Sequence, residues 1–143
     1  MKILFLDDMP QRWHTFCTKI PDKYLDDCYY AESYDEAVEL VEDNGVDYFT
    51  HYFLDHDLNE EDYASVIEAD EHYGSTSEEG SKNGTVFARW MVENKCKADV
   101  IVCHSMNPAG RDKMQSILKG QCSHDVFDAP FGWKTPERFL TTK

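Results

Sequence analysis

The feature that most constrains the fold is an alternation of short apolar runs with helical patterns. Apolar runs occupy residues 2–6, 28–31, 46–54, 98–103 and 126–129, and apolar residues recur at three- and four-residue spacing in most segments between them. Runs that are apolar at successive positions indicate strands buried on both faces. Strands that alternate with helices predict right-handed β-α-β crossovers. We therefore expect a three-layer α/β domain built on a five-stranded parallel sheet.

Residues that favour helix starts support this order. Ser33, followed by Glu36, has the pattern of a capping box, and Asn107 before Pro108 is a common way to begin a helix. The other helix starts are expected at Pro10, at Gly84 and at Pro136.

The length of 143 residues fits a single domain spanning residues 1–143. Residues 59–83 break the alternation with an acidic stretch rich in Gly and Ser, directly after the third strand. Because long excursions at strand ends are more often functional than idle, we expect an acidic insertion that acts as a lid. The alternative is a charged loop that only keeps the protein soluble.

The charge balance restricts the partners. The chain has 14 Lys and Arg against 28 Asp and Glu, a formal net charge of −14. This charge excludes a general nucleic-acid coat and an anionic membrane surface. We expect a small phosphorylated or nucleotide substrate or an RNA end, with no membrane and no long duplex nucleic acid as partner. The sequence leaves the oligomeric state open.

The chain has the marks of a cytoplasmic protein. The apolar run at residues 2–6 is too short for a signal peptide or a membrane span. The five cysteines are odd in number and include no Cys-x-x-Cys pair, which favours reduced thiols.

Acidic residues follow two of the predicted strands. Asp7 and Asp8 end the first, and Asp55 and Asp57 end the third. The carboxyl ends of parallel strands carry the binding site, and carboxylates gathered there raise one another's pKa unless a cation is present. Asp7, Asp8 and Asp55 are therefore expected to bind Mg²⁺, or Mn²⁺ if a histidine takes part. The alternative for each acidic group is a turn, a helix cap or a solvated loop.

His104 ends the fourth strand and is the first candidate for proton transfer, because imidazole titrates near neutral pH. The equally weighted alternative is a hydrogen-bonded histidine at a strand end. Together with His104, Asp55 and Asp57 are the expected catalytic residues.

Four further residues are candidates for substrate binding. Ser105 can bond a phosphoryl oxygen, and Arg111 follows a helix start that can face an anion. Asn107 is an amide near the site, and Trp133 can stack on a base. The alternatives are a helix cap for Asn107, a solvated position for Arg111 and a packed core aromatic for Trp133.

These residues resemble a receiver domain of two-component signalling, which implies a flavodoxin-like fold. Asp7-Asp8 is similar to the receiver's Mg²⁺-binding acidic pair, Asp55 falls at the phosphoacceptor position, and Gly84 resembles the glycine that opens the third helix. The chain departs from receivers at His104, where they carry Thr or Ser, and at Ala129, where they carry Lys before Pro.

A more specific resemblance rests on Phe-Leu-Asp-Asp, Phe-Leu-Asp-His-Asp-Leu, His-Ser-Met-Asn-Pro and Pro-Phe-Gly-Trp. This combination is similar to the cyclic-phosphate processing receiver domains, which are modified receivers. The resemblance implies action on cyclic phosphates or nucleotides in RNA metabolism. The site residues that it implies are Asp7, Asp8, Asp55, Asp57 and His104.

The first functional hypothesis is a metal-dependent phosphoesterase that hydrolyses a cyclic phosphate or a nucleotide-type phosphoester. The second is a signalling domain phosphorylated on Asp55. The third is a catalytically inactive receiver-like module that recruits a partner through its acidic insertion.

Overall fold

The structure is a computed structural model, and it describes residues 1–58, 82–105, 107–129 and 137–140 of the chain. Its strands are β1 (Ile3–Leu6), β2 (Cys28–Ala31), β3 (His51–Leu54), β4 (Val100–Cys103) and β5 (Val126–Asp128). They form one parallel five-stranded sheet in the order β2-β1-β3-β4-β5. The predicted sheet is confirmed, and its strand order reverses direction between β1 and β3.

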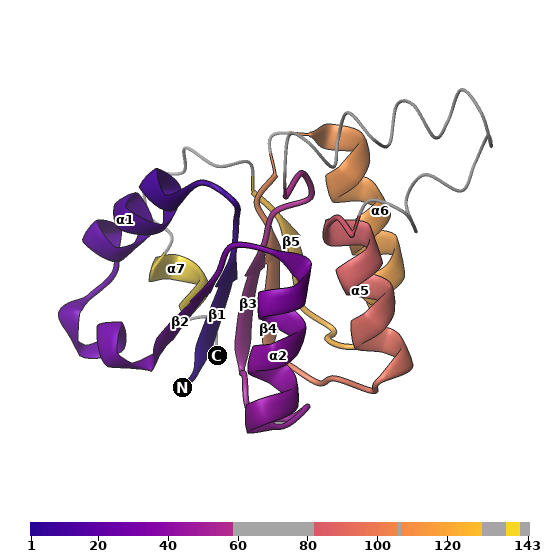
Figure 1. Ribbon diagram of the computed structural model, residues 1–143, viewed down its shortest axis with the longest axis horizontal. Coiled ribbons are helices and arrows are strands. Elements are labelled where there is room, and N and C mark those ends of the chain that lie inside the picture. Colours follow the sequence, from indigo (N-terminus) through magenta and orange to yellow (C-terminus); the bar gives the residue numbers. More distant parts are fainter. Residues whose placement is uncertain (59–81, 106, 130–136, 141–143) are drawn as a thin grey trace.

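Helices cover both faces of the sheet (Figure 1). The described helices are α1 (Pro10–Lys19), α2 (Tyr34–Asn44), α5 (Gly84–Glu93), α6 (Pro108–Leu118) and α7 (Glu137–Leu140), with a 3₁₀ turn over Asp22–Asp27. Helices α1 and α7 lie on one face, and α2, α5 and α6 lie on the other. This is the three-layer α/β arrangement that the alternation of strands and helices predicts.

The core divides into two layers because successive strand residues point to opposite faces. In β1, Leu4 and Leu6 pack towards α2, α5 and α6, whereas Ile3 and Phe5 pack towards α1 and α7. The same alternation runs through β3 and β4, and all four residues of each of these strands are buried. Burial on both faces explains why the residues of β1 and β4 are apolar at successive positions.

The helix starts follow the predicted side-chain caps. Ser33 Oγ accepts a hydrogen bond from Glu36 N at 3.2 Å, and Asn107 Oδ1 accepts one from Gly110 N at 3.1 Å. Asn83 plays the same part for α5, where its Oδ1 accepts from Val86 N at 3.1 Å. Each cap satisfies a backbone N–H that has no partner within the helix.

The strand predicted over residues 46–54 is too long. β3 covers only His51–Leu54, because its neighbour β1 has four residues and pairs with it only from Ile3↔His51 to Leu6↔Leu54. The preceding Tyr48 and Phe49 pack on Tyr29 instead, and the Tyr48 and Tyr29 hydroxyls lie 2.5 Å apart. β4 likewise begins at Val100, two residues later than expected.

Three predicted features lie wholly or largely outside the described residues. Of the acidic insertion expected at residues 59–83, only Lys82 and Asn83 are described. Trp133 and Pro136 fall within residues 130–136, which are not described. None of the described helices has the length and apolar character that crossing a bilayer requires. All five cysteines are described, and all five are free thiols.

Candidate active site

The site lies at the carboxyl ends of β1, β3 and β4. The register of these parallel strands pairs their last residues, Leu6, Leu54 and Cys103, with one another. The next residues are Asp7, Asp55 and His104. Backbone bonds continue the alignment, from Asp55 N to Leu6 O and from His104 N to Leu54 O, both 2.9 Å. This is also where the strand order reverses, the usual place for a site in such a sheet.

Asp7, Asp55 and His104 form a compact buried group. One ligand atom of each lies within 4.8 Å of the others. His104 Nε2 lies 2.9 Å from Asp7 Oδ2, which accepts its hydrogen bond, and the imidazole stacks on Phe5 with ring centroids 4.9 Å apart. Asp7 and His104 are wholly buried and Asp55 is 2% exposed. The structure therefore brings together two expected metal ligands and the histidine expected to transfer protons.

Burial and the mutual repulsion of the acidic groups shift the pKa values of the site residues. Burial, reinforced by the charge of Asp7, raises the pKa of Asp55 to about 8. Burial and Asp7 also raise the pKa of the half-buried Asp8 to about 6. Burial lowers the pKa of His104, against the opposing effect of its hydrogen bond to Asp7. Asp8, the third expected ligand, lies close enough to Asp7 to feel its charge but is not in the three-residue group.

Arg12 is the site residue that sequence reasoning missed. Its Nη1 lies 3.4 Å from Asp7 Oδ2 and 3.7 Å from Asp55 Oδ2. The strand pattern contains the signal that would have found it. Asp7 and Asp55 follow Leu6 and Leu54, which face α2, α5 and α6, so the alternation turns both acids towards α1, the helix that carries Arg12.

A second, more exposed group lies beside the buried one. His56 Nδ1 and Asp57 Oδ1 are 2.8 Å apart, and the Asn107 amide nitrogen lies 3.4 Å from the same Asp57 oxygen. The bond from His56 lowers the pKa of Asp57. The Asp57 side chain is 44% exposed, against 12% for His56. Asp57 and Asn107, both predicted site residues, thus lie together, and Asn107 caps α6 at the same time.

Ser105 and Arg111 are engaged with the protein itself. Ser105 Oγ accepts a bond from Asn107 N at 3.0 Å, and its carbonyl accepts one from Arg111 Nη1 at 2.7 Å. Arg111 Nε also pairs with Asp128 at the end of β5. Arg111 therefore ties α6 to the ends of β4 and β5. Trp133, the remaining predicted substrate-binding residue, lies outside the described residues.

Two glycines let the helices approach the acidic turn closely. A Cβ at Gly84 would clash with the Asp55 carbonyl and lie 2.7 Å from His56 Cα, and one at Gly110 would overlap the His56 ring. Gly84 N also donates to His56 O at 2.8 Å. The turn at Asp55 and His56 is thus held between the first turns of α5 and α6, and Gly84 has a packing reason for opening its helix.

The donor set of the buried group fits a divalent cation. Two carboxylates and an imidazole suit Mn²⁺ well, and Mg²⁺ accepts the carboxylates and keeps waters elsewhere. Burial and then the charge of Asp7 raise the pKa of Asp55, and a bound cation would oppose both effects.

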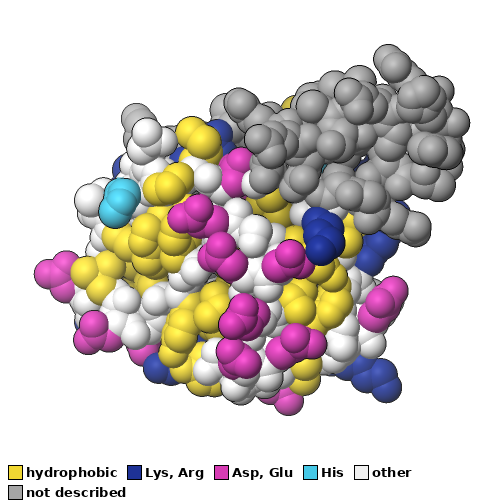
Figure 2. Space-filling model, viewed as in Figure 1, with side chains coloured by type: hydrophobic (Ala, Val, Ile, Leu, Met, Phe, Trp, Pro, Cys, Tyr) yellow, Lys and Arg dark blue, Asp and Glu magenta, His cyan; other side chains and the backbone are white. Residues whose placement is uncertain are grey.

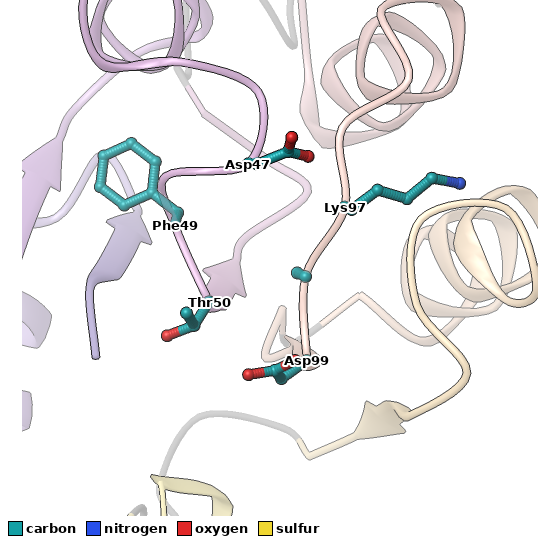
Figure 3. A pocket seen from close by; sticks show the side chains of 6 residues that line it. Asp47, Phe49, Thr50, Lys97 and Asp99 are labelled. Carbon is teal, nitrogen blue, oxygen red and sulfur yellow. The ribbon is translucent and has the colours of Figure 1, made fainter.

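A pocket of about 190 Å³ at the opposite edge of the sheet has no such donor set (Figure 3). Its lining mixes Asp47 and Asp99 with Lys97, whose side chain points away from Asp99 in this view. The Lys97 ammonium donates to the Gln121 carbonyl at 2.7 Å. The charged groups do not converge on one point, and we assign this pocket no ligand.

Sheet order β2-β1-β3-β4-β5, with acids at the ends of β1 and β3, defines a receiver-like α/β domain. A family model for the cyclic-phosphate processing receiver domain matches residues 2–120. The chain belongs to that family, as its motifs predicted.

Comparison with solved structures supports the fold. One match is a fusion of the yeast Spc42 trimeric coiled coil (amino acids 181–211) to another structure. Its TM-score is 0.51 and its sequence identity is 18%. The match covers 89% of this chain and 67% of that one, and at this identity it shows the fold alone. No curated protein matches the chain.

Proposed function

We propose that this protein is a divalent-cation-dependent phosphoesterase that hydrolyses a cyclic phosphate or a nucleotide-type phosphoester. The observation that carries the proposal is the buried group of Asp7, Asp55 and His104 at the carboxyl edge of the sheet. Membership of a family linked to cyclic-phosphate processing supports the choice of substrate class.

In this proposal the Asp7 and Asp55 carboxylates would hold Mg²⁺ or Mn²⁺, His104 would keep Asp7 in position, and Asp8 lies near Asp7. When bound, such a cation polarises a phosphoryl oxygen and lowers the pKa of water. Hydrolysis of a cyclic phosphate adds one water: its oxygen bonds to phosphorus, one P–O ester bond breaks, and the leaving oxygen takes up a proton.

Two histidines are available for handling protons, in different settings. His104 was expected from the sequence to transfer a proton, but its full burial and its bond to Asp7 favour a role in holding that carboxylate. The His56–Asp57 pair is partly exposed, and a proton can be held between His56 Nδ1 and Asp57 Oδ1. We assign proton exchange with the substrate to this pair, and Asn107 orients it.

A second candidate function is phosphoryl acceptance by Asp55. It is favoured by Arg12, which supplies positive charge 3.7 Å from Asp55 although Ala129 occupies the position of the receiver lysine. Incubation with acetyl phosphate and Mg²⁺, followed by mass spectrometry, separates the two: a stable phosphoryl adduct on Asp55 without phosphoester turnover supports signalling.

The decisive experiment is a screen of cyclic and linear phosphoesters with Mg²⁺ or Mn²⁺, in which wild type is compared with Asp55→Asn. We expect turnover that chelation abolishes and that Asp55→Asn lacks. Asp35→Asn is the matched control, because it removes the same charge from a side chain that is 72% exposed. Full activity of Asp55→Asn would refute this site, and a wild type that binds neither cation would favour the inactive binding module.

A separate prediction concerns His104. If it positions Asp7 for the cation, His104→Ala lowers cation affinity and turnover by similar factors, as measured by calorimetry and by initial rates. A loss of turnover far greater than the loss of cation affinity would instead establish His104 as the proton-transfer residue.

A further inference from the structure

We propose that Arg12 binds the phosphate group of the substrate, and that cation binding shifts its guanidinium from Asp7 and Asp55 to that phosphate. This inference rests on the proposed function, because it assigns a role in the same site. The Arg12 side chain is 27% exposed, whereas those of Asp7 and Asp55 are 0% and 2% exposed. Among these three side chains, Arg12 is therefore the one that solvent, and with it a small anion, can reach.

The oxygens that Arg12 contacts are the ones that a metal ion would need. Asp7 Oδ1 accepts a bond from Met9 N at 2.8 Å, and Asp55 Oδ1 accepts one from His56 N at 2.9 Å. The Oδ2 atoms of both acids face Arg12, at 3.4 and 3.7 Å, and Asp7 Oδ2 also accepts the hydrogen bond of His104 Nε2 at 2.9 Å. A divalent cation held by Asp7 and Asp55 would compete with the guanidinium for these carboxylates, and its double charge favours it. The Arg12 guanidinium could then exchange its contacts with the carboxylates for a phosphate beside the cation.

The site also becomes positively charged in the same step. Without a cation, the two acids and the guanidinium carry no net positive charge, in a protein of net charge −14. With a divalent cation, these four groups carry a net positive charge and attract an anion. The exchange makes cation binding and phosphate binding favour each other.

Two other cations in the described part of the chain are engaged with acids or carbonyls of their own. Arg111 bonds the Ser105 carbonyl and pairs with Asp128, and Lys82, just before α5, pairs with Asp35 at 3.1 Å. Arg12 also has the more suitable shape, because a guanidinium offers two parallel N–H groups to two phosphate oxygens. In this chain it takes the part for which receivers have a lysine after the fifth strand.

Two titrations of the same variants test the proposal. Mg²⁺ is first titrated into metal-free wild type, Arg12→Gln and Arg12→Lys, and inorganic phosphate is then titrated into each Mg²⁺-loaded protein. Arg89→Gln is the matched control, since it is the same substitution at an exposed position on α5. Circular dichroism and thermal unfolding establish that each variant is folded.

We expect the loss of Arg12 to affect the two affinities differently: Mg²⁺ affinity is kept or increased, and phosphate affinity falls. Arg12→Gln binds Mg²⁺ at least as tightly as wild type, because a competing cation is gone, but binds phosphate at least tenfold more weakly. Arg12→Lys recovers part of the phosphate affinity, and Arg89→Gln matches wild type in both titrations. If Arg12 only supported the fold, its loss would weaken both ligands together.

Three results would overturn the assignment: unchanged phosphate affinity in Arg12→Gln, loss of Mg²⁺ affinity in that variant, or no phosphate binding by loaded wild type. Failure of the proposed function looks different. Phosphate binding that depends on Arg12, without hydrolysis of any phosphoester, leaves the assignment standing and refutes the enzyme. Hydrolysis with an unchanged KM in Arg12→Gln refutes the assignment and leaves the enzyme standing.

Discussion

Asp55 is a carboxyl group placed where its charged form is costly. It is 2% exposed, and burial together with Asp7 raises its pKa to about 8 from an ordinary value of 3.8. Because the folded pKa is the higher one, the folded protein keeps a proton that the unfolded chain releases. The stability linked to this group is complete below about pH 4 and is lost as the pH rises through about 8.

This linkage gives a prediction for the metal-free protein. As the pH rises from about 5 to about 8, the free energy of unfolding of Asp55→Asn should increase relative to wild type, by at most about 1.4 kcal/mol per pH unit. Urea unfolding in the presence of a chelator measures it, with Asp35→Asn as the control for loss of an acidic group. A difference between Asp55→Asn and wild type that does not vary with pH would contradict it.

Single residues also mark the limit of what the sequence reveals about the site. Asp7, Asp55 and His104 were predicted to meet because each ends an apolar run, and the level strands bring them within 4.8 Å. Arg12 ends no apolar run, because it lies inside a helix, and only the side-chain alternation that turns both acids towards α1 points to it. The roles of these residues in binding and catalysis remain predictions.

At the scale of elements, strand existence was predictable and strand length was not. Apolarity reports burial, and Phe49 is as buried as the β3 residues although it makes no strand. The length of β3 depends on its partner β1, which lies more than forty residues away along the chain. Helix starts were more accurate, because Ser33 and Asn107 bond their own first turns and need no distant partner.

The close packing of α5 on the acidic turn gives a prediction for Gly84. Alanine normally favours a helix over glycine by about 1 kcal/mol. Gly84→Ala should instead destabilise the protein by roughly 1–3 kcal/mol, because its Cβ would meet the Asp55 carbonyl and His56 Cα. It should also lower activity, since relief of the clash moves Asp55.

Thermal and urea unfolding measure the effect, and Ser116→Ala, at an exposed position on α6, is the control. Gly84→Ala with stability equal to or greater than wild type would show that the turn gives way at no cost, which would argue against a rigid site.

At the scale of the whole molecule, the net charge of −14 complicates any measurement with cations. Acidic side chains are scattered over the face shown in Figure 2 rather than gathered in one patch. Any salt therefore screens their mutual repulsion and stabilises the fold to some extent. Site binding has to be distinguished from this general effect.

We expect Mg²⁺ at about a hundred times its dissociation constant to add about 2.7 kcal/mol of stability, which raises the unfolding temperature by roughly 5–10 °C. Sodium chloride at equal ionic strength should give a much smaller shift, and Asp55→Asn should respond equally to both salts. Equal shifts from both salts in wild type would mean that no cation site is present.

The level register of β1, β3 and β4 has a consequence for how such a site can change over time. The strand register fixes three positions, those directly after Leu6, Leu54 and Cys103. Any residue at one of these positions points towards the α1 side of the sheet. Point substitutions can therefore exchange one chemistry for another without rebuilding the scaffold, as His104 in place of the receiver's Thr or Ser illustrates. Inserting or deleting one strand residue would turn the side chain at such a position towards the opposite face of the sheet, because side chains alternate along a strand. The chemistry of the site can therefore change by substitution at these positions, but not by lengthening or shortening a strand.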